Sequence, residues 1–305
     1  MNKSMKKTIT VGIPAHNEEK NIGKLLESIF AQKQEGYILE KVIVACDGCT
    51  DNTDGIAHYF MEKYPAVQLV NDGDRIGKSG RSNNFFRMNR SDILVILDAD
   101  TILRSSDTLR FITEAFGDPS IGLVAGADMP YPPETLFESI VITAVDLWRS
   151  IRLNIDHGDT VHNSHGCALA FSKDFAEKLT IPKGINGDDH YAYFRSKELG
   201  FSFRYATKAV VNYREPSNPC DFIIQRSRFY VINGHMIEIF GSWVKPYYKS
   251  VPLSEKLPAI LSMFLHRPIL LPLALMLEFF MRLHIKTRKQ YISGSMWDTV
   301  QSTKK

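Results

Sequence analysis

The feature that most constrains this sequence is an alternation of short apolar runs with segments of helical periodicity between Thr8 and Ala127. The apolar runs are rich in β-branched residues and predict strands at Thr8–Pro14, Lys41–Ala45, Val67–Asn71, Ile93–Leu97 and Ile121–Ala127. The intervening segments predict helices at Glu18–Gln32, Asp51–Tyr64, Ser79–Met88 and Leu109–Phe116. Continuous apolar strands that alternate with helices form parallel sheets buried on both faces. We therefore expect an α/β fold with a mostly parallel central sheet covered by helices.

The second half of the chain is less regular. It predicts helices at Glu134–Leu153, Asp189–Glu198 and Asp221–Phe240, with short strands at Cys167–Phe171, Phe201–Tyr205 and Ala209–Tyr213. Beyond these elements the composition changes to apolar stretches among many Lys and Arg residues and few acids. We therefore expect a main domain over residues 1–240 and a helical tail over residues 241–305.

The tail contains two apolar runs, Leu257–Leu265 and Ile269–Phe280, and both are shorter than the roughly 20 residues that span a bilayer. Basic residues flank the pair on both sides, and a single crossing would place one basic flank outside. We therefore favour helices that lie in the membrane interface or form a re-entrant hairpin. The alternative is a buried helical pair packed on the main domain.

Composition narrows the classes further. The chain has 305 residues, of which 44% are hydrophobic and 23% charged, which excludes a disordered protein. The net charge of +3 gives no reason to expect a nucleic-acid partner. Cys46 and Cys49 form a C-x-x-C pair without a second one, so reduced thiols are favoured over a redox motif or half a zinc site. No apolar segment of signal-peptide length follows the basic N-terminus, so we expect a cytoplasmic protein.

Two carboxylates, Asp98 and Asp100, directly follow the apolar run Ile93–Leu97. Their spacing of two directs them to the same side at a strand end, where they repel each other unless a cation lies between them. Mg²⁺ or Mn²⁺ suits such oxygen ligands and also bridges substrate phosphates. The pattern predicts a divalent-metal site, and a solvated turn is the alternative.

Polar residues follow other predicted strands as well. The turn Pro14-Ala15-His16-Asn17-Glu18 would let the backbone approach a nucleotide, and Asp47 could accept hydrogen bonds from a nucleobase. Thr50, Asp51 and Thr53 are typical of turn and helix-capping positions. Gly77 and Lys78 precede a predicted helix and suit a phosphate-rich ligand, although a solvated basic loop has the same composition.

Two further groups concern the reaction itself. Asp188 and Asp189 open a predicted helix, where acids stabilise the helix dipole or one of them serves as a general base. Gln225, Arg228 and Phe229 share one face of the helix Asp221–Phe240. Arg228 suits a diphosphate leaving group and Phe229 can stack on a sugar, although Arg also occurs on helices for solubility.

Taken together and in this order, these motifs resemble those of family 2 glycosyltransferases with the GT-A fold, over about residues 8–240. The resemblance implies an inverting single displacement from a nucleotide-diphosphate sugar with Mg²⁺ or Mn²⁺. It implies that Asp47 binds the base, that Asp98 and Asp100 bind the diphosphate and metal, and that Asp189 deprotonates the acceptor. Pro14, Ala15, Asn17, Glu18, Gly77 and Lys78 would complete the donor site.

Gln225, Arg228 and Phe229 match the Q-x-x-R-W motif of polysaccharide synthases, with Phe in place of Trp. Cys46 and Asp188 stand where the family often has Asp and Glu. The segment Ser295-Met296-Trp297-Asp298-Thr299 resembles the gating segment of the same synthases. With Cys46 in place of Asp, recognition of the nucleobase would rest more heavily on Asp47. Asp188 in place of Glu leaves the adjacent general base, Asp189, unchanged.

The resemblance implies a metal-dependent hexosyl- or N-acetylhexosaminyltransferase that uses a UDP-sugar. We expect a lipid-linked or glycan acceptor, at the cytoplasmic face of a membrane, in cell-surface polysaccharide or glycolipid synthesis. One alternative is a polysaccharide synthase subunit with a separate channel partner. Another is a catalytically silent glycan-binding scaffold.

Overall fold

A computed structural model of the protein describes residues 6–287 and 300–304. The chain forms two compact units. The first unit comprises Met1–Met129, Ser164–Tyr213 and Lys304–Lys305, and the second comprises Pro130–Asn163 and Arg214–Thr303. The boundary expected at residue 240 does not coincide with the boundary between these units.

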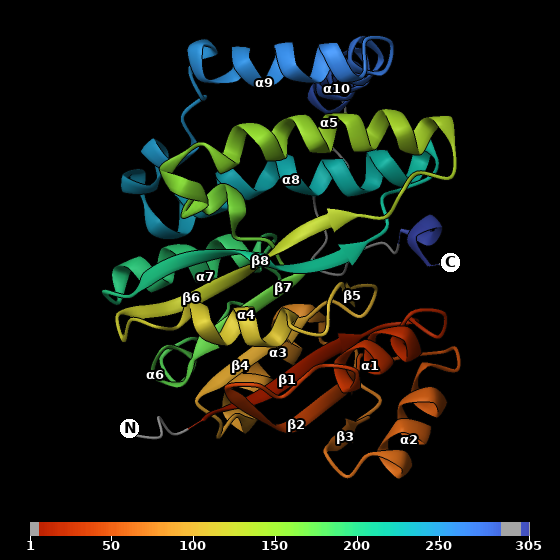
Figure 1. The fold of residues 1–305 in the computed structure, drawn as a ribbon, viewed down its shortest axis with the longest axis vertical. Helices are drawn as coiled ribbons and strands as arrows, with labels where there is room; N and C mark the ends of the chain where they lie inside the picture. Colours follow the sequence, from red (N-terminus) through yellow and green to blue (C-terminus); the bar gives the residue numbers. More distant parts are fainter. Residues whose placement is uncertain (1–5, 288–299, 305) are drawn as a thin grey trace. The chain divides into compact units, whose positions relative to one another are not determined.

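The first unit is built on an eight-stranded sheet with the order β3-β2-β1-β4-β7-β6-β8-β5 (Figure 1). The strands are β1 (Lys7–Ala15), β2 (Tyr37–Cys46), β3 (Val67–Val70), β4 (Ile93–Leu97), β5 (Ile102–Leu103), β6 (Ile121–Pro130), β7 (Ala168–Ser172) and β8 (Ser202–Tyr213). Strands β3, β2, β1 and β4 are parallel, as the alternating pattern predicts. The pairs β4–β7, β6–β7 and β5–β8 are antiparallel, so the sheet is mixed.

The first unit contains the helices predicted within it and one short additional helix at Lys173–Ala176. They are α1 (Ile22–Phe30), α2 (Thr53–Lys63), α3 (Gly77–Met88), α4 (Thr108–Ala115), α6 (Lys173–Ala176) and α7 (Asp188–Glu198). Helix α1 buries Ile22, Leu25, Leu26 and Ile29, which are residues of its predicted apolar face. Helix α3 packs on β1 so closely that a Cβ at Gly12 would lie 2.7 Å from the ring of Phe85. The core therefore holds α3 in a fixed position beside the end of β1.

One strand prediction is wrong. The two short strands predicted at Phe201–Tyr205 and Ala209–Tyr213 form one strand, β8, which begins at Ser202. Thr207 and Lys208, which suggest a break by composition, are exposed on β8. Polar side chains on the solvent face are compatible with an uninterrupted strand.

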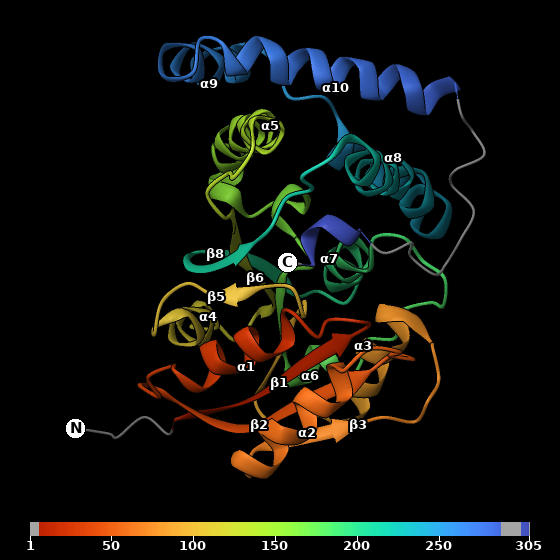
Figure 2. The same cartoon turned by 90° about the vertical axis from the view of Figure 1, so that its right-hand side faces the viewer.

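The second unit is helical, with α5 (Leu136–Leu153), α8 (Pro219–Phe240), α9 (Leu253–His266) and α10 (Leu270–Thr287). Short 3₁₀ turns cover Asp156–Gly158, Val161–Asn163, Ser242–Tyr248 and Gln301–Thr303. Thr135 and Glu138 form a capping box that starts α5. Helices α9 and α10 both contact α5 and point in different directions, since α9 runs across the view in Figure 1 and α10 in Figure 2. Leu271 packs in a cluster with Leu147 and Ile151. Among the described residues, every helix is too short or too polar to cross a bilayer.

Candidate active site

The parallel strands bring three predicted motifs to one edge of the sheet. Ala15 at the end of β1 pairs with Cys46 at the end of β2, and β4 pairs with β1 on its other side. The segments that follow are 16–18, 47–53 and 98–100. Because carboxyl ends of parallel strands share an edge, these loops are neighbours at the location where such sheets bind ligands.

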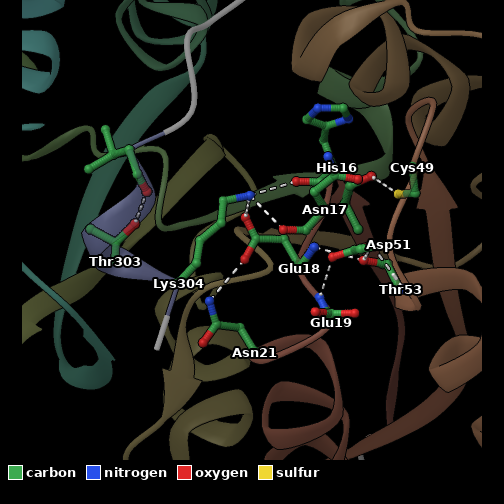
Figure 3. Close-up of polar contacts among 12 residues, drawn as sticks. His16, Asn17, Glu18, Glu19, Asn21, Cys49, Asp51, Thr53, Thr303 and Lys304 are labelled. Atoms are coloured by element: carbon green, nitrogen blue, oxygen red, sulfur yellow. Dashed lines mark hydrogen bonds and ion pairs between the residues drawn. The ribbon is translucent and has the colours of Figure 1, made fainter.

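The loop after β1 is tied to the turn after β2 by hydrogen bonds (Figure 3). The Thr50 amide donates to Asn17 Oδ1 at 2.7 Å, and the Glu18 amide donates to Thr53 Oγ1 at 2.7 Å. Asn17 has φ +53°, a conformation that non-glycine residues rarely adopt. Thr50 and Thr53 thus have the structural role expected from their sequence, since they hold Asn17 and Glu18 in place.

Asp47 is buried, and its carboxylate accepts hydrogen bonds from the start of α3. Its Oδ1 accepts from the Ile76 amide at 2.8 Å and from Arg81 Nε at 3.0 Å, and its Oδ2 accepts from the Gly77 amide at 3.0 Å. The completely buried Arg81 also forms a two-pronged ion pair with Asp72. Asp47 and Arg81 therefore position the start of α3, in addition to any role that Asp47 has in binding a base.

Arg81 was not singled out by the sequence. It belongs to the basic segment Arg75–Asn84, which suits a phosphate ligand by composition. The sequence feature that could have indicated a buried Arg81 is its position one helical turn after Gly77, on a helix that packs on the sheet. A buried Arg requires a carboxylate partner, and Asp47 is the neighbouring acid that supplies it.

Lys78 joins three parts of the first unit. Its Nζ lies 2.5 Å from Asp98 Oδ1 and 3.9 Å from Asp188 Oδ2, and it donates to the Gly166 carbonyl at 3.1 Å. The turn after β4 is closed by a hydrogen bond from the Thr101 amide to the Asp98 carbonyl. The start of α3, the turn after β4 and the start of α7 therefore meet at one ammonium group.

The acids around Lys78 have displaced pKa values. Burial raises the pKa of Asp98 to about 6, opposed by Lys78 and reinforced by Asp100. Burial raises the pKa of Asp100 to about 6, with the charge of Glu18 adding to the rise. For Asp189, burial and the adjacent Asp188 raise the pKa to about 7. Burial would lower the pKa of Lys78, but Asp98 and Asp188 raise it above its usual value.

Gly166 lies where these groups converge. A Cβ at this position would lie 2.6 Å from Lys78 Nζ, 3.8 Å from Asp98 Oδ2 and 3.9 Å from Asp189 Oδ2. Asp98 and Asp189, which are far apart in sequence, therefore line the same small volume. Only a residue without a side chain leaves that volume open, a requirement that the sequence alone did not reveal.

The acidic cluster fits a divalent cation that takes part of its coordination from a ligand. Within residues 6–287 and 300–304, no three His, Cys, Asp or Glu side chains are grouped so that they could hold a metal ion by themselves. Asp98 and Asp100 offer hard oxygen donors whose pKa values are raised by burial and by a neighbouring carboxylate, which is Asp100 for Asp98 and Glu18 for Asp100. A cation relieves that repulsion, and Mg²⁺ in particular is commonly held by one or two carboxylates together with substrate phosphates.

The remaining predicted residues lie elsewhere. Gln225, Arg228 and Phe229 are on α8 in the second unit, where Phe229 is half-exposed. The segment 295–299 lies outside the described residues. The functions predicted for these positions stay predictions.

The first unit is thus a mixed α/β fold that carries acidic side chains beyond the ends of its parallel strands. The chain belongs to glycosyl transferase family 2, whose family model matches residues 10–179. The GT-A fold is confirmed by solved structures. A mannosyltransferase from Pyrobaculum calidifontis, in complex with GDP-Man and Mn²⁺, has a TM-score of 0.62 at 22% identity, covering 90% of this chain and 74% of that one.

Glucosyl-3-phosphoglycerate synthase from Mycobacterium tuberculosis, in complex with Mn²⁺, UDP and phosphoglyceric acid, has a TM-score of 0.54 at 18% identity, covering 76% of this chain and 78% of that one. By sequence, a 4,4'-diaponeurosporenoate glycosyltransferase from Staphylococcus haemolyticus is 36% identical over 110 residues, or 36% of this chain and 28% of that protein. A dolichyl-phosphate β-glucosyltransferase from Trichomonas vaginalis is 28% identical over 105 residues, 32% of each chain. This chain thus spans about a third or less of the length of these two relatives.

Proposed function

We propose that this protein is an inverting glycosyltransferase that moves a sugar from a nucleoside-diphosphate donor onto a hydroxyl group. The observation that carries the proposal is the convergence of Lys78, Asp98 and Asp189 around Gly166. The cluster combines a cation, a metal-binding carboxylate and a carboxylate with a raised pKa, next to the loops that follow β1 and β2. Family membership supports the same reaction class.

Different residues of the first unit would bind the metal, stabilise the leaving group and accept the proton. Asp98 and Asp100 would hold Mg²⁺ or Mn²⁺, which neutralises charge on a departing diphosphate when it is bound. Lys78 adds a fixed positive charge at the same place, and preorganised charge of this kind is a large catalytic term. Asp189 accepts the proton of the acceptor hydroxyl, for which a pKa of about 7 is well matched to neutral pH. The loop Pro14–Glu18 and the Asp47 turn provide the surface for the nucleoside.

The donor and acceptor are proposed from the relatives. The two solved structures contain GDP-Man and UDP, so either nucleotide is a suitable test ligand, and we propose UDP first. One relative is named for dolichyl phosphate, a lipid. We therefore propose a lipid-linked or glycan acceptor, with Gln225, Arg228 and Phe229 contributing to acceptor or diphosphate binding.

We also propose that the second unit binds a membrane surface. Helices α9 and α10 and the turn between them expose many large apolar side chains, among them Leu257, Leu261, Phe264, Leu265, Ile269, Leu273, Met276, Phe279 and Phe280. Exposed Lys245, Lys249 and Arg282 accompany them. An exposed apolar surface with basic flanks suits an anionic bilayer. Co-sedimentation with phosphatidylglycerol vesicles but not with phosphatidylcholine vesicles is expected, and equal absence from both pellets would refute the proposal.

The function is tested by incubating the protein with UDP- and GDP-sugars, Mn²⁺ or Mg²⁺, and lipid-phosphate or glycan acceptors, and by measuring released nucleoside diphosphate. Turnover is expected for at least one donor, and Asp98→Asn and Asp189→Asn should lower it by orders of magnitude. Asp174→Asn, which changes an exposed acid on α6, is the matched control. Turnover in Asp189→Asn at a rate close to that of the parent would overturn the assignment of the base. Mass spectrometry of the product distinguishes single addition from a polymer.

A further inference from the structure

Lys304 makes an unexpected contact with the loop after β1. Its Nζ lies 2.8 Å from Glu18 Oε1 and donates to the carbonyl oxygens of His16 at 2.8 Å and Asn17 at 2.7 Å (Figure 3). All of these residues belong to the first unit, although Lys304 is 288 positions from His16. No periodicity or motif around residue 304 predicts this contact.

The ammonium group of Lys304 is fully hydrogen-bonded and largely buried. A lysine ammonium group has three N–H donors and no acceptor. The two carbonyls and the carboxylate provide one acceptor for each donor. The side chains are also largely withdrawn from solvent, since Lys304 is 14% exposed and Glu18 13%. A solvent-exposed ion pair has neither this geometry nor this burial.

The loop that Lys304 holds is constrained from two directions. On one side, Thr50 and Thr53 bind Asn17 and Glu18. On the other side, Lys304 binds the carbonyls of His16 and Asn17 and the carboxylate of Glu18. Asn17, with φ +53°, needs such support because the conformation is unfavourable for a residue with a side chain.

Lys304 also offsets negative charge at the sheet edge that carries Glu18, Asp98 and Asp100. Burial raises the pKa of Glu18, and Lys304 opposes that rise more strongly than any other group. Glu18 and the metal-binding acids affect each other, because Asp98 contributes to the raised pKa of Glu18 and Glu18 to that of Asp100. Without Lys304, Glu18 would add an uncompensated negative charge where a diphosphate must bind.

We propose that Lys304 is a positioning residue of the donor site, which fixes the His16–Glu18 loop and neutralises Glu18 so that a nucleoside diphosphate can bind beside it. The inference rests on the proposed function, because it assumes that this loop receives the donor. Lys304 acts through Glu18 and the loop backbone, and it takes no part in the chemical step. Its loss therefore weakens donor binding and leaves the rate of transfer from bound donor nearly unchanged.

The opposite role would be a plug, in which the ammonium group occupies the position of a donor group and must leave before the donor binds. The acceptors of Lys304 argue for positioning. These acceptors are two backbone carbonyls and a carboxylate, all of which repel phosphate oxygens, so the ammonium group does not occupy a position where a diphosphate would bind.

The test uses the full chain with Lys304→Ala, Lys304→Arg and the control Lys20→Ala, which removes the same charge from an exposed side chain two residues after Glu18. Binding of UDP and of GDP in the presence of Mn²⁺ is measured by calorimetry, and donor KM and kcat are measured separately. We expect Lys304→Ala to raise Kd and KM about tenfold, the scale of one charge-assisted hydrogen bond, with kcat within about threefold. Lys304→Arg should restore most of the affinity, and Lys20→Ala should match the parent.

A double variant separates positioning from a general loss of structure. In a Glu18→Gln background the charge that Lys304 neutralises is gone, so adding Lys304→Ala should change Kd less than it does alone. An unchanged Kd in Lys304→Ala would overturn the proposal, and a lower Kd would identify a plug instead. If the parent bound neither nucleotide and turned over no donor, the proposed function itself would fall and this inference with it.

Discussion

The two units depart from an ordinary globular protein in different ways. Both units bury charge, the first at Arg81, Asp47 and Asp188 and the second at Glu138 and Arg152, but only in the first do buried acids gather around a lysine, Lys78, with raised pKa values. The second unit exposes apolar side chains on α9, on α10 and in the turn between them, where Leu265 is 80% exposed and Ile269 75%. Buried charge and contiguous exposed apolar surface are the informative exceptions in a fold, because neither stabilises an isolated chain in water. We propose that the acidic cluster of the first unit serves the chemical step and that the exposed apolar surface of the second unit binds a membrane surface.

The largest effect is expected where the buried charge is catalytic. Asp189→Asn keeps the shape of the side chain but cannot accept a proton, so kcat should fall about 10³-fold. The same change should stabilise the protein. Because the pKa of Asp189 is raised to about 7, its ionisation disfavours the folded state increasingly as pH rises from about 4 to about 7.

Urea unfolding at pH 5 and pH 8 provides the second measurement. Asp189→Asn should gain more than about 1 kcal/mol over the parent at pH 8 and less at pH 5, since one unit of pKa displacement corresponds to about 1.4 kcal/mol. A variant that lost both activity and stability at pH 8 would show that Asp189 is structural, and the contrast between the units would lose its main support.

Buried charge that only supports the site should behave differently. Arg81→Met removes the partner of Asp47 and leaves a buried carboxylate without compensation, so the free energy of unfolding should fall by about 3 kcal/mol. Asp72→Asn removes a partner of the same arginine that is itself 43% exposed, and it should destabilise the protein clearly less than Arg81→Met does. Equal losses in denaturant titrations of the two variants would contradict the distinction.

In the second unit, substitutions on the exposed apolar surface should change membrane binding and leave stability nearly unchanged. The double substitution Leu265→Ser and Ile269→Ser removes exposed apolar area and should leave stability within about 0.5 kcal/mol. It should weaken partition onto phosphatidylglycerol vesicles about 30-fold, the factor for roughly 2 kcal/mol. The matched control is Leu271→Ser in the same region, which is 2% exposed and should lose stability instead. Unchanged vesicle binding in the double variant would show that this surface has another partner.

The contrast also separates what the sequence predicts from what it does not. The strands before Asp47 and Asp98 are recognisable because local apolar runs specify buried strands, and the loops that follow share an edge by the geometry of parallel sheets. The apolar face of α1 is recognisable from its period for the same reason. These are local patterns, and their consequences hold in the structure.

Contacts between distant segments carry no such local signal. The antiparallel insertion of β7 between β4 and β6 depends on long-range pairing, and β5 is only two residues long. The positions of Arg81 against Asp47, of Gly166 against Lys78 and of Lys304 against Glu18 are set by tertiary packing. The aspartates could therefore be named from the sequence, whereas the groups that position and neutralise them could not.

The smallest expected effect is on the pH dependence of the reaction. Asp189 must be ionised to act as a base, so kcat/KM should rise with pH and level off at or below about 7, since a bound metal cation nearby lowers the pKa that Asp189 has in the metal-free protein. After burial, the charge of Asp188 is the largest cause of the raised pKa of Asp189. In Asp188→Asn that repulsion is absent, so the pKa of Asp189 falls and the rise should occur about half a unit or more lower in pH.

The measurement requires saturating Mn²⁺, because a bound metal keeps carboxylate ligands such as Asp98 and Asp100 ionised and removes their titration from the profile. The midpoint of the profile is compared between variants instead of the maximal rate, since Asp188 also lies 3.9 Å from Lys78 and its loss can lower the rate at every pH. Asp174→Asn should keep the parent midpoint. A midpoint in Asp188→Asn that equals that of the parent would mean that the titrating group is not Asp189, and that the buried charge of the first unit serves binding but not proton transfer.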